Sequence, residues 1–139
     1  MPSRVTRTPV PGGEGPPPFE STNRYEEALR RLDEDDPAGA ARIFERLVSE
    51  VDPGRYTLQI MVACETETLK TLLSQSGREV RLLYLLPFAL QARSCYRVFW
   101  GIYRSKDEAA GAIETLPAPL VRAEGKPLVL SIGRLRRSQ

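Results

Sequence analysis

Residues 94–113 have the sequence SCYRVFWGIYRSKDEAAGAI: an aromatic-rich run, a glycine, and then an alanine-rich stretch with helical spacing. Ser105 and Glu108 have the spacing of a capping box, in which two side chains satisfy free backbone amides at the start of a helix. The stretch therefore predicts a strand that is followed at once by a helix. The inward side of that helix is expected to carry Ala109, Ala112, Ile113 and Leu116.

Similar patterns lie before and after this strand–helix pair. The predicted strands lie within residues 56–64, 79–90, 95–103 and 126–135, with the second expected to end near Pro87, and the predicted helices cover residues 65–77 and 106–116. The resulting order is β-α-β-β-α-β. This is the split ferredoxin-like or RNP-like arrangement, an α+β fold with a four-stranded antiparallel sheet and two helices on one face.

Side chains alternate between the two faces of such a sheet, so the helices cover only one set from each strand. The set expected beneath the helices is Leu58, Ile60 and Val62 of the first strand, with Val98 and Trp100 of the third. The other set is expected on an open face, and the first and third strands are the two inner ones, so its members should lie close together. These outward residues are Thr57, Gln59, Met61, Cys95, Arg97 and Phe99.

The expected open face combines an amide, a guanidinium and an aromatic ring. Such a surface suits a polymer with flat apolar patches and many hydrogen-bonding groups, and both sugars and unstacked bases have this character. RNA-recognition domains use the same face of the same topology. However, residues 96–103 lack the third-strand signature of those domains, and a net charge of +2, from 20 basic and 18 acidic residues, is low for a nucleic-acid binder.

Residues 56 to about 135 resemble a SPOR domain, the sporulation-related repeat that binds peptidoglycan. The first strand of that family has the form y-x-v-Q-v, which Tyr56, Thr57, Leu58, Gln59 and Ile60 match. The third strand and the following helix have the forms y-R-V-x-v-G-P-f and s-x-x-e-A. These are matched by Tyr96, Arg97, Val98, Gly101, Tyr103, Ser105, Glu108 and Ala109, while Ile102, Trp100 and Val62 depart from the family's usual residues.

The resemblance implies non-catalytic binding of peptidoglycan glycan strands, with a preference for denuded strands that have lost their stem peptides. It also implies a place in the cell envelope, commonly at the division septum. Together with the alternation pattern, it indicates Gln59, Met61, Arg97 and Phe99 as the glycan-binding residues. Tyr84 and Tyr103 are expected to be structural.

The N-terminal part of the chain has a different character. Residues 1–22 are rich in proline and glycine and predict a disordered arm. Residues 23–54 predict a helical hairpin whose second helix has Asp36 as N-cap and Pro37 in its first turn. Ala40 and Phe44 resemble the A-x-x-x-F spacing of a tetratricopeptide unit, which implies a surface for a protein partner. The alternative is a plain amphipathic hairpin that packs on the domain of residues 55–139.

Composition argues against an enzyme. The chain has no histidine, which excludes Ser-His and Cys-His nucleophile pairs and the commonest zinc sites, and it has no glycine-rich phosphate loop. We therefore expect no catalytic residue, metal or cofactor. The third class of function that stays open, beside glycan and nucleic-acid binding, is a protein-interaction module that uses the hairpin.

The location of the protein follows only from the resemblance. The strongly apolar run at residues 82–90 is too short to span a bilayer, and the first twenty residues lack the apolar core of a secretory signal. A periplasmic protein would then require a truncated chain or a displaced start. The alternative is a cytoplasmic protein.

Two cysteines, Cys64 and Cys95, lie at the end of the first strand and the start of the third. Antiparallel pairing would bring these two strand ends near each other. Simple alternation nevertheless places the two side chains on opposite faces, and only a bulge would reconcile them. The sequence leaves open whether they form a disulfide, which would imply an oxidising compartment.

Overall fold

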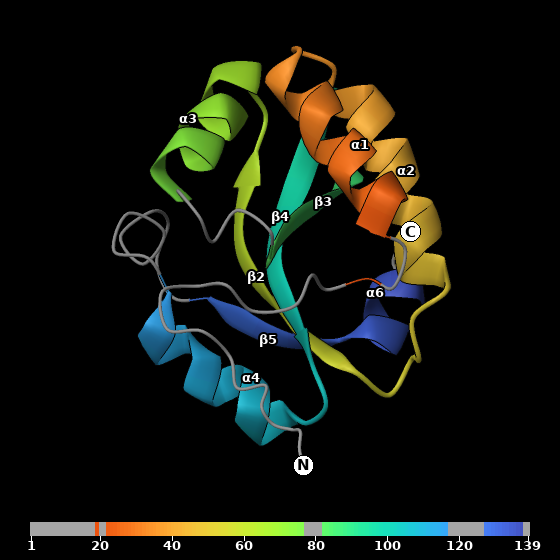
Figure 1. Ribbon diagram of the computed structural model, residues 1–139, viewed down its shortest axis with the longest axis vertical. Coiled ribbons are helices and arrows are strands. Elements are labelled where there is room, and N and C mark those ends of the chain that lie inside the picture. The colour runs from red at the N-terminus through yellow and green to blue at the C-terminus, as the bar shows by residue number, and fades with distance from the viewer. Residues whose placement is uncertain (1–18, 20–21, 77–81, 117–126, 138–139) are drawn as a thin grey trace.

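The computed structural model describes residue 19 and residues 22–76, 82–116 and 127–137. These residues form an α+β fold with a four-stranded antiparallel sheet and five α-helices (Figure 1). The arm predicted at residues 1–22 lies almost wholly outside the described residues.

The strands are arranged in the order β3-β4-β2-β5, so β4 and β2 are the inner pair. In chain order the elements are α1 (Thr22–Asp33), α2 (Pro37–Ser49), β2 (Tyr56–Ala63), α3 (Thr66–Ser76), β3 (Leu83–Leu90), β4 (Arg93–Tyr103), α4 (Lys106–Ala112), the 3₁₀ turn η2 (Ile113–Thr115), β5 (Leu128–Ser131) and α6 (Ile132–Arg137).

Side-chain caps determine where two of the helices begin. Asp36 Oδ1 accepts a hydrogen bond from Gly39 N at 3.0 Å, and Pro37 is the first residue of α2. Ser105 Oγ accepts a hydrogen bond from Glu108 N at 3.1 Å at the start of α4. Each cap satisfies an amide that has no partner within its helix. Both predicted helix starts are confirmed.

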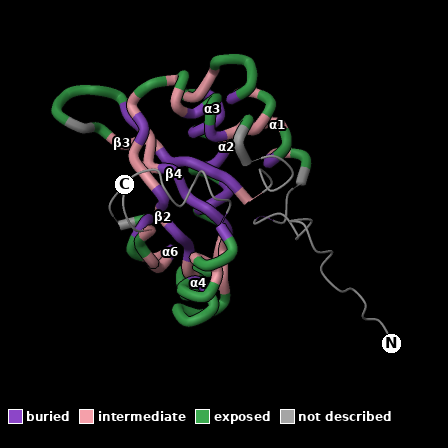
Figure 2. Tube along the Cα trace, turned by 90° about the vertical axis from the view of Figure 1, so that its left-hand side faces the viewer, coloured by how far each residue is buried: buried purple, intermediate pink, exposed green. Residues whose placement is uncertain are grey.

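Helices lie on both sides of the sheet. In Figure 1, α3 and α4 lie on one side of the strands, and α1, α2 and α6 lie on the other. The buried part of the chain runs mainly along the strands, while the exposed parts are the loops and the outer surfaces of the helices (Figure 2). We call the two surfaces of the sheet the α3/α4 face and the second face.

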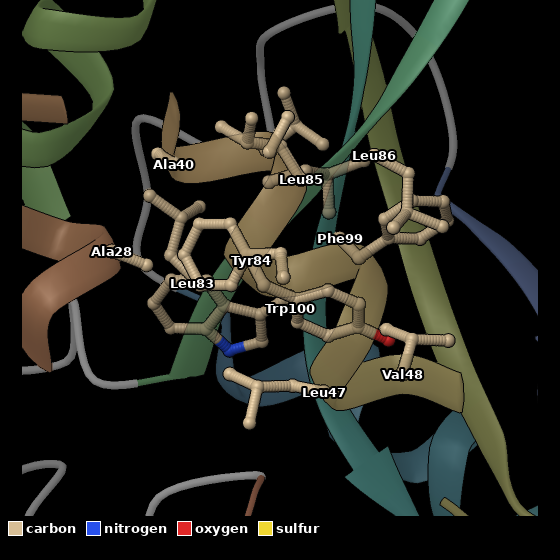
Figure 3. Packing of buried hydrophobic residues seen from close by; sticks show 14 of the residues in the cluster. Ala28, Ala40, Leu47, Val48, Leu83, Tyr84, Leu85, Leu86, Phe99 and Trp100 are labelled. Carbon is tan, nitrogen blue, oxygen red and sulfur yellow. The ribbon is translucent and has the colours of Figure 1, made fainter. Parts of the chain in front are cut away.

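The second face is not fully open, contrary to the expectation from sequence. The Phe44 ring of α2 lies 6.3 Å from the Tyr84 ring of β3, and Tyr84 stacks on Phe99 of β4 at 5.2 Å between ring centroids. From α1, Tyr25 Oη donates a hydrogen bond of 2.7 Å to Leu83 O. The residues packed together here include Ala28, Leu47, Tyr84 and Phe99 (Figure 3). Helices α1 and α2 therefore cover β3 and part of β4.

Thr57 of β2 is another residue of the second face that is covered and not open. It was expected to face solvent, but it is fully buried. Its Oγ1 donates a hydrogen bond to Gly101 O at 2.6 Å and accepts one from Tyr84 Oη at 2.6 Å. Burial raises the pKa of the Tyr84 hydroxyl, so this group stays protonated and can act as the donor.

The C-terminal end of the fold also differs from the expectation of a strand at residues 126–135. Strand β5 ends at Ser131, whose Oγ accepts a hydrogen bond from Arg134 N at 3.1 Å and so begins α6. Ile132 and Leu135 are fully buried. Arg136 donates hydrogen bonds to carbonyl oxygens at the end of α2, including Val51 O at 2.7 Å. Arg136 thus connects α6 to the end of α2.

Candidate functional site

Two β-bulges determine which side chains of β2 and β4 share a face. Tyr56 pairs with Tyr103 and Leu58 with Trp100, so β4 carries an extra residue at Gly101, where φ is +77°. The pairing then shifts back between Gln59 and Met61, where β2 carries the extra residue. A bulge places two residues of one strand opposite one of the other and so changes the alternation beyond it.

The second bulge corrects the predicted place of Met61. Met61 pairs with Val98, and Val62 pairs with Arg97. Directly paired residues share a face, so Met61 lies on the α3/α4 face with Val98. Val62, which was expected beneath α3 and α4, lies on the second face with Arg97. Strict alternation from Gln59 predicted the reverse because it contains no bulge.

Gln59 and Arg97 are brought together as predicted. Arg97 Nε donates a hydrogen bond to Gln59 Oε1 at 3.0 Å, and both side chains are half-buried. The Arg97 guanidinium also lies 5.6 Å from the centroids of the Phe88 and Phe99 rings, within the range of cation–π attraction. Burial, with a smaller effect from the charge of Arg134, lowers the pKa of Arg97.

Phe99 lies on the predicted face but does not reach its surface. Its side chain is fully buried because Tyr84 stacks on it, with Phe44 of α2 beyond Tyr84. The expectation that Phe99 contacts a ligand directly is therefore wrong for this arrangement. Its ring instead supports the Arg97 guanidinium from the core side.

Two residues that the sequence pattern did not indicate complete the part of the second face that the described helices leave partly exposed. Leu128 of β5 pairs with Gln59 and is 53% exposed. Phe88 of β3 is half-buried beside Arg97. Phe88 lies beyond Pro87, where the sequence predicted that this strand ends, but β3 continues through Pro87 to Leu90 because it stays paired with β4. Only the register shows which residues of the strands adjoin Gln59 and Arg97. We call Gln59, Val62, Phe88, Arg97 and Leu128 the Gln59–Arg97 site.

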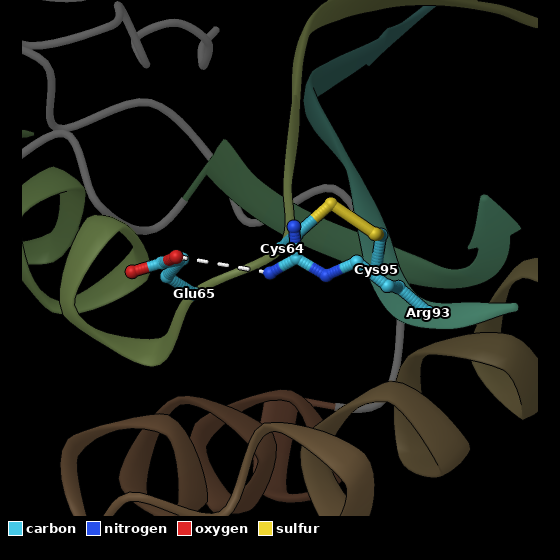
Figure 4. The surroundings of a disulfide bond; sticks show 4 residues. All are labelled: Cys64, Glu65, Arg93 and Cys95. Carbon is cyan, nitrogen blue, oxygen red and sulfur yellow. Dashed lines mark ion pairs between the residues drawn. A yellow bond between two sulfur atoms is a disulfide. The ribbon is translucent and has the colours of Figure 1, made fainter. Parts of the chain in front are cut away.

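A disulfide joins Cys64 and Cys95, across a sequence separation of 31 residues (Figure 4). The shift at the second bulge continues to Ala63, which pairs with Tyr96, so the next position along β2 comes opposite Cys95. Without this shift, Cys64 would lie opposite Ser94. An exposed ion pair of 3.7 Å between Arg93 and Glu65 flanks the disulfide and contributes little stability.

The site contains hydrogen-bonding groups beside apolar surface. Among the described residues, no group of three or more His, Cys, Asp or Glu side chains is placed to hold a metal ion. In the same part of the chain, none of the helices combines the length and the apolar character needed to cross a membrane. A scan against models of known protein families found no match to this chain, and a search of curated proteins also found none.

Proposed function

We propose that residues 55–139 bind the glycan strands of peptidoglycan at the Gln59–Arg97 site, without catalysis. In this proposal, β2, α3, β3, β4, α4 and β5 form a ferredoxin-like domain of the SPOR kind, preceded by a helical hairpin of α1 and α2. The observation that carries it is the 3.0 Å hydrogen bond from Arg97 to Gln59 on the part of the second face that the described helices leave partly exposed, next to the exposed Leu128.

The chemistry of the site fits a polysaccharide. The guanidinium donates and the amide both donates and accepts, so the pair can bind neighbouring sugar hydroxyls. Leu128 and Phe88 provide apolar surface for the C–H faces of the sugar rings. A nucleic-acid backbone would instead need several basic side chains to neutralise its phosphates, and the net charge of the whole chain is only +2.

We further propose that the protein acts in the cell envelope, in the periplasm and at division septa. The disulfide between Cys64 and Cys95 supports this proposal because such bonds persist in oxidising compartments. A cytoplasmic protein would be expected to keep both cysteines reduced. Thiol labelling of the protein in intact cells tests this point, and labelling of both cysteines without added reductant would contradict a periplasmic location.

Co-sedimentation with purified cell-wall sacculi tests the binding proposal. The protein is mixed with sacculi before and after an amidase removes the stem peptides, and the bound fraction is measured in the pellet. We expect binding to increase after amidase treatment, because the proposed ligand is the denuded glycan. Absence of the protein from both pellets, together with tight binding to single-stranded oligonucleotides, would support the nucleic-acid alternative instead.

A further inference from the structure

Helix α2 is flanked by two surface hollows, neither of which is lined by Gln59 or Arg97, although the second shares Phe88 with the Gln59–Arg97 site. The first, of about 320 Å³, lies between α1 and α2, and we call it the basic groove. Its lining consists of four arginines and one glutamate, with Gly39 and Ile43: the charged residues are Arg24, Glu27, Arg31, Arg42 and Arg46. The second, of about 340 Å³, lies between α2 and the hairpin of β3 and β4, and we call it the hairpin hollow. Its lining includes Ala38, Ala41, Arg42, Phe88, Cys95 and Tyr96.

Arg42 lines both hollows and so connects them. On the α2 helix, Ala38 and Ala41 lie on the side toward the hairpin, and Ile43 and Arg46 lie on the side toward α1. The position of Arg42 between these two sets follows from the 100° turn per residue of an α-helix. A segment that crosses α2 at Arg42 would therefore contact an apolar hollow on one side and a basic groove on the other.

The arginines of the basic groove differ in their partners. Arg24 pairs with Glu50 at 2.7 Å, and Arg31 pairs with Glu27 at 3.2 Å and with Asp36 at 3.1 Å. Glu50, Glu27 and Asp36 therefore already form ion pairs with arginines of α1.

Arg42 and Arg46 lie one helical turn apart on the exposed side of α2. Within the part of the chain that the structure describes, no ion pair within 4.0 Å involves either guanidinium, although the charge of Arg42 contributes to the lowered pKa of Asp36 and that of Arg46 to the lowered pKa of Glu50. Two guanidinium groups with this spacing can each bind a carboxylate of a partner through charge-assisted hydrogen bonds.

We propose that α2 binds an acidic segment of a partner protein that carries one apolar anchor residue. The anchor enters the hairpin hollow, and carboxylates on either side of it pair with Arg42 and Arg46. Residues 22–50 hold eight acidic and five basic residues, a net charge of −3, which disfavours a nucleic acid because its phosphate backbone would be repelled. A peptide with a few carboxylates at matched positions avoids most of this repulsion, and the apolar hollow gives it an anchor.

Fluorescence anisotropy with a labelled synthetic peptide tests the proposal. The probe has one central leucine with two glutamates on each side. Two matched probes replace the leucine by glycine or every glutamate by glutamine. We expect the first probe to bind at low ionic strength and both matched probes to bind more weakly, because each lacks one of the two kinds of contact.

Variants of the protein then assign the binding to α2. Arg42→Gln/Arg46→Gln should weaken binding of the leucine probe by about five- to tenfold, since two charge-assisted contacts are lost. Arg30→Gln/Arg55→Gln removes the same charge from exposed positions outside both hollows and should leave binding unchanged. Ala38→Gln should reduce binding of the leucine probe to that of the glycine probe, because the longer side chain occupies the hollow.

Several results would overturn the proposal. These are no binding of the leucine probe, equal effects of the two double variants, or equal binding of the leucine and glycine probes. Tight binding of a single-stranded oligonucleotide that depends on Arg42 and Arg46 would assign the groove to nucleic acid instead. Self-association in sedimentation that the Arg42→Gln/Arg46→Gln variant abolishes would assign it to a second copy of this chain. Binding of the Arg42→Gln/Arg46→Gln variant to sacculi should be unchanged. A failure of the proposal for α2 can therefore be told apart from a failure of the glycan-binding proposal.

Discussion

Tyr84 Oη donates a 2.6 Å hydrogen bond to Thr57 Oγ1, which in turn donates to Gly101 O, so one buried chain of hydrogen bonds joins β3, β2 and β4. Tyr84 also stacks on Phe99 and lies against Phe44 of α2. This relationship connects the second face of the sheet to the helices that cover it. It explains why the outward-facing pattern of Thr57 does not produce an exposed residue.

Thr57→Val should destabilise the protein by about 1–3 kcal/mol, because it leaves the Tyr84 hydroxyl and the Gly101 carbonyl buried without this partner. Tyr84→Phe should cost less, about 1 kcal/mol, since Thr57 keeps its bond to Gly101. Urea unfolding of both variants measures the two values. A larger loss for Tyr84→Phe than for Thr57→Val would contradict the hydrogen-bond order described above.

Gly101 and Gly111 form a matched pair for substitution by alanine. At Gly101, φ is +77° and an added Cβ would collide with the Tyr103 ring, so Gly101→Ala should cost at least about 1–3 kcal/mol. At Gly111, in exposed helix α4, an added Cβ meets nothing within 4 Å, and Gly111→Ala should stabilise by about 0.5–1 kcal/mol. Thermal melts of the two variants should shift in opposite directions. Equal shifts would argue against the bulge at Gly101.

Reduction of the disulfide should lower the free energy of unfolding. The bond between Cys64 and Cys95 closes a loop across 31 residues, and the chain-entropy relation assigns such a loop about 3–4 kcal/mol. Urea unfolding with and without a dithiol measures the difference. The Cys64→Ser/Cys95→Ser variant is the control, because reductant should not change its stability. Identical unfolding curves of the native protein in both conditions would show that the bond is not formed.

Arg97→Ala and Val98→Ala separate the two faces of β4. Arg97→Ala should reduce binding to sacculi while lowering stability by less than about 1 kcal/mol, because its side chain is only half-buried. Val98→Ala removes methyl groups from a fully buried position and should cost roughly 1 to 3 kcal/mol, with little effect on binding by the folded protein. Co-sedimentation and thermal melts of both variants test this. The opposite pattern would mean that the faces of β4 are inverted.

Stability should fall at alkaline pH. Burial, with a smaller effect from the charge of Glu108, raises the pKa of Tyr103 to about 12 from the ordinary 10.0. The folded state therefore holds this proton more tightly than the unfolded state. The protonated Tyr103 hydroxyl therefore contributes of the order of 2 kcal/mol to the free energy of unfolding. This contribution is complete below pH 10 and is lost as the pH rises toward 12. Urea unfolding across this range, with Tyr103→Phe for comparison, measures the effect, and the variant should show a smaller decline.

The sequence by itself predicted the strands and helices that the structure describes within residues 56–76 and 83–112, because alternation, helical spacing and caps are short-range properties. Ser105 and Asp36 begin their helices through bonds to residues three positions away, and both helix starts are as predicted. The approach of Gln59 to Arg97 was also predicted, because β2 and β4 were expected to be the two inner strands and both side chains were expected on the same face.

Only the tertiary structure decided which parts of that pattern become surface. Phe99 is buried because of helices more than fifty positions away in the chain, and alternation within one strand contains no information about them. Met61 changed face and Cys64 came opposite Cys95 because a bulge in β2 shifted the register against β4. Each bulge shifts all later positions of its strand by one residue relative to the partner strand. The place of a bulge depends on how the two strands pair, and the sequence of one strand alone does not contain that information.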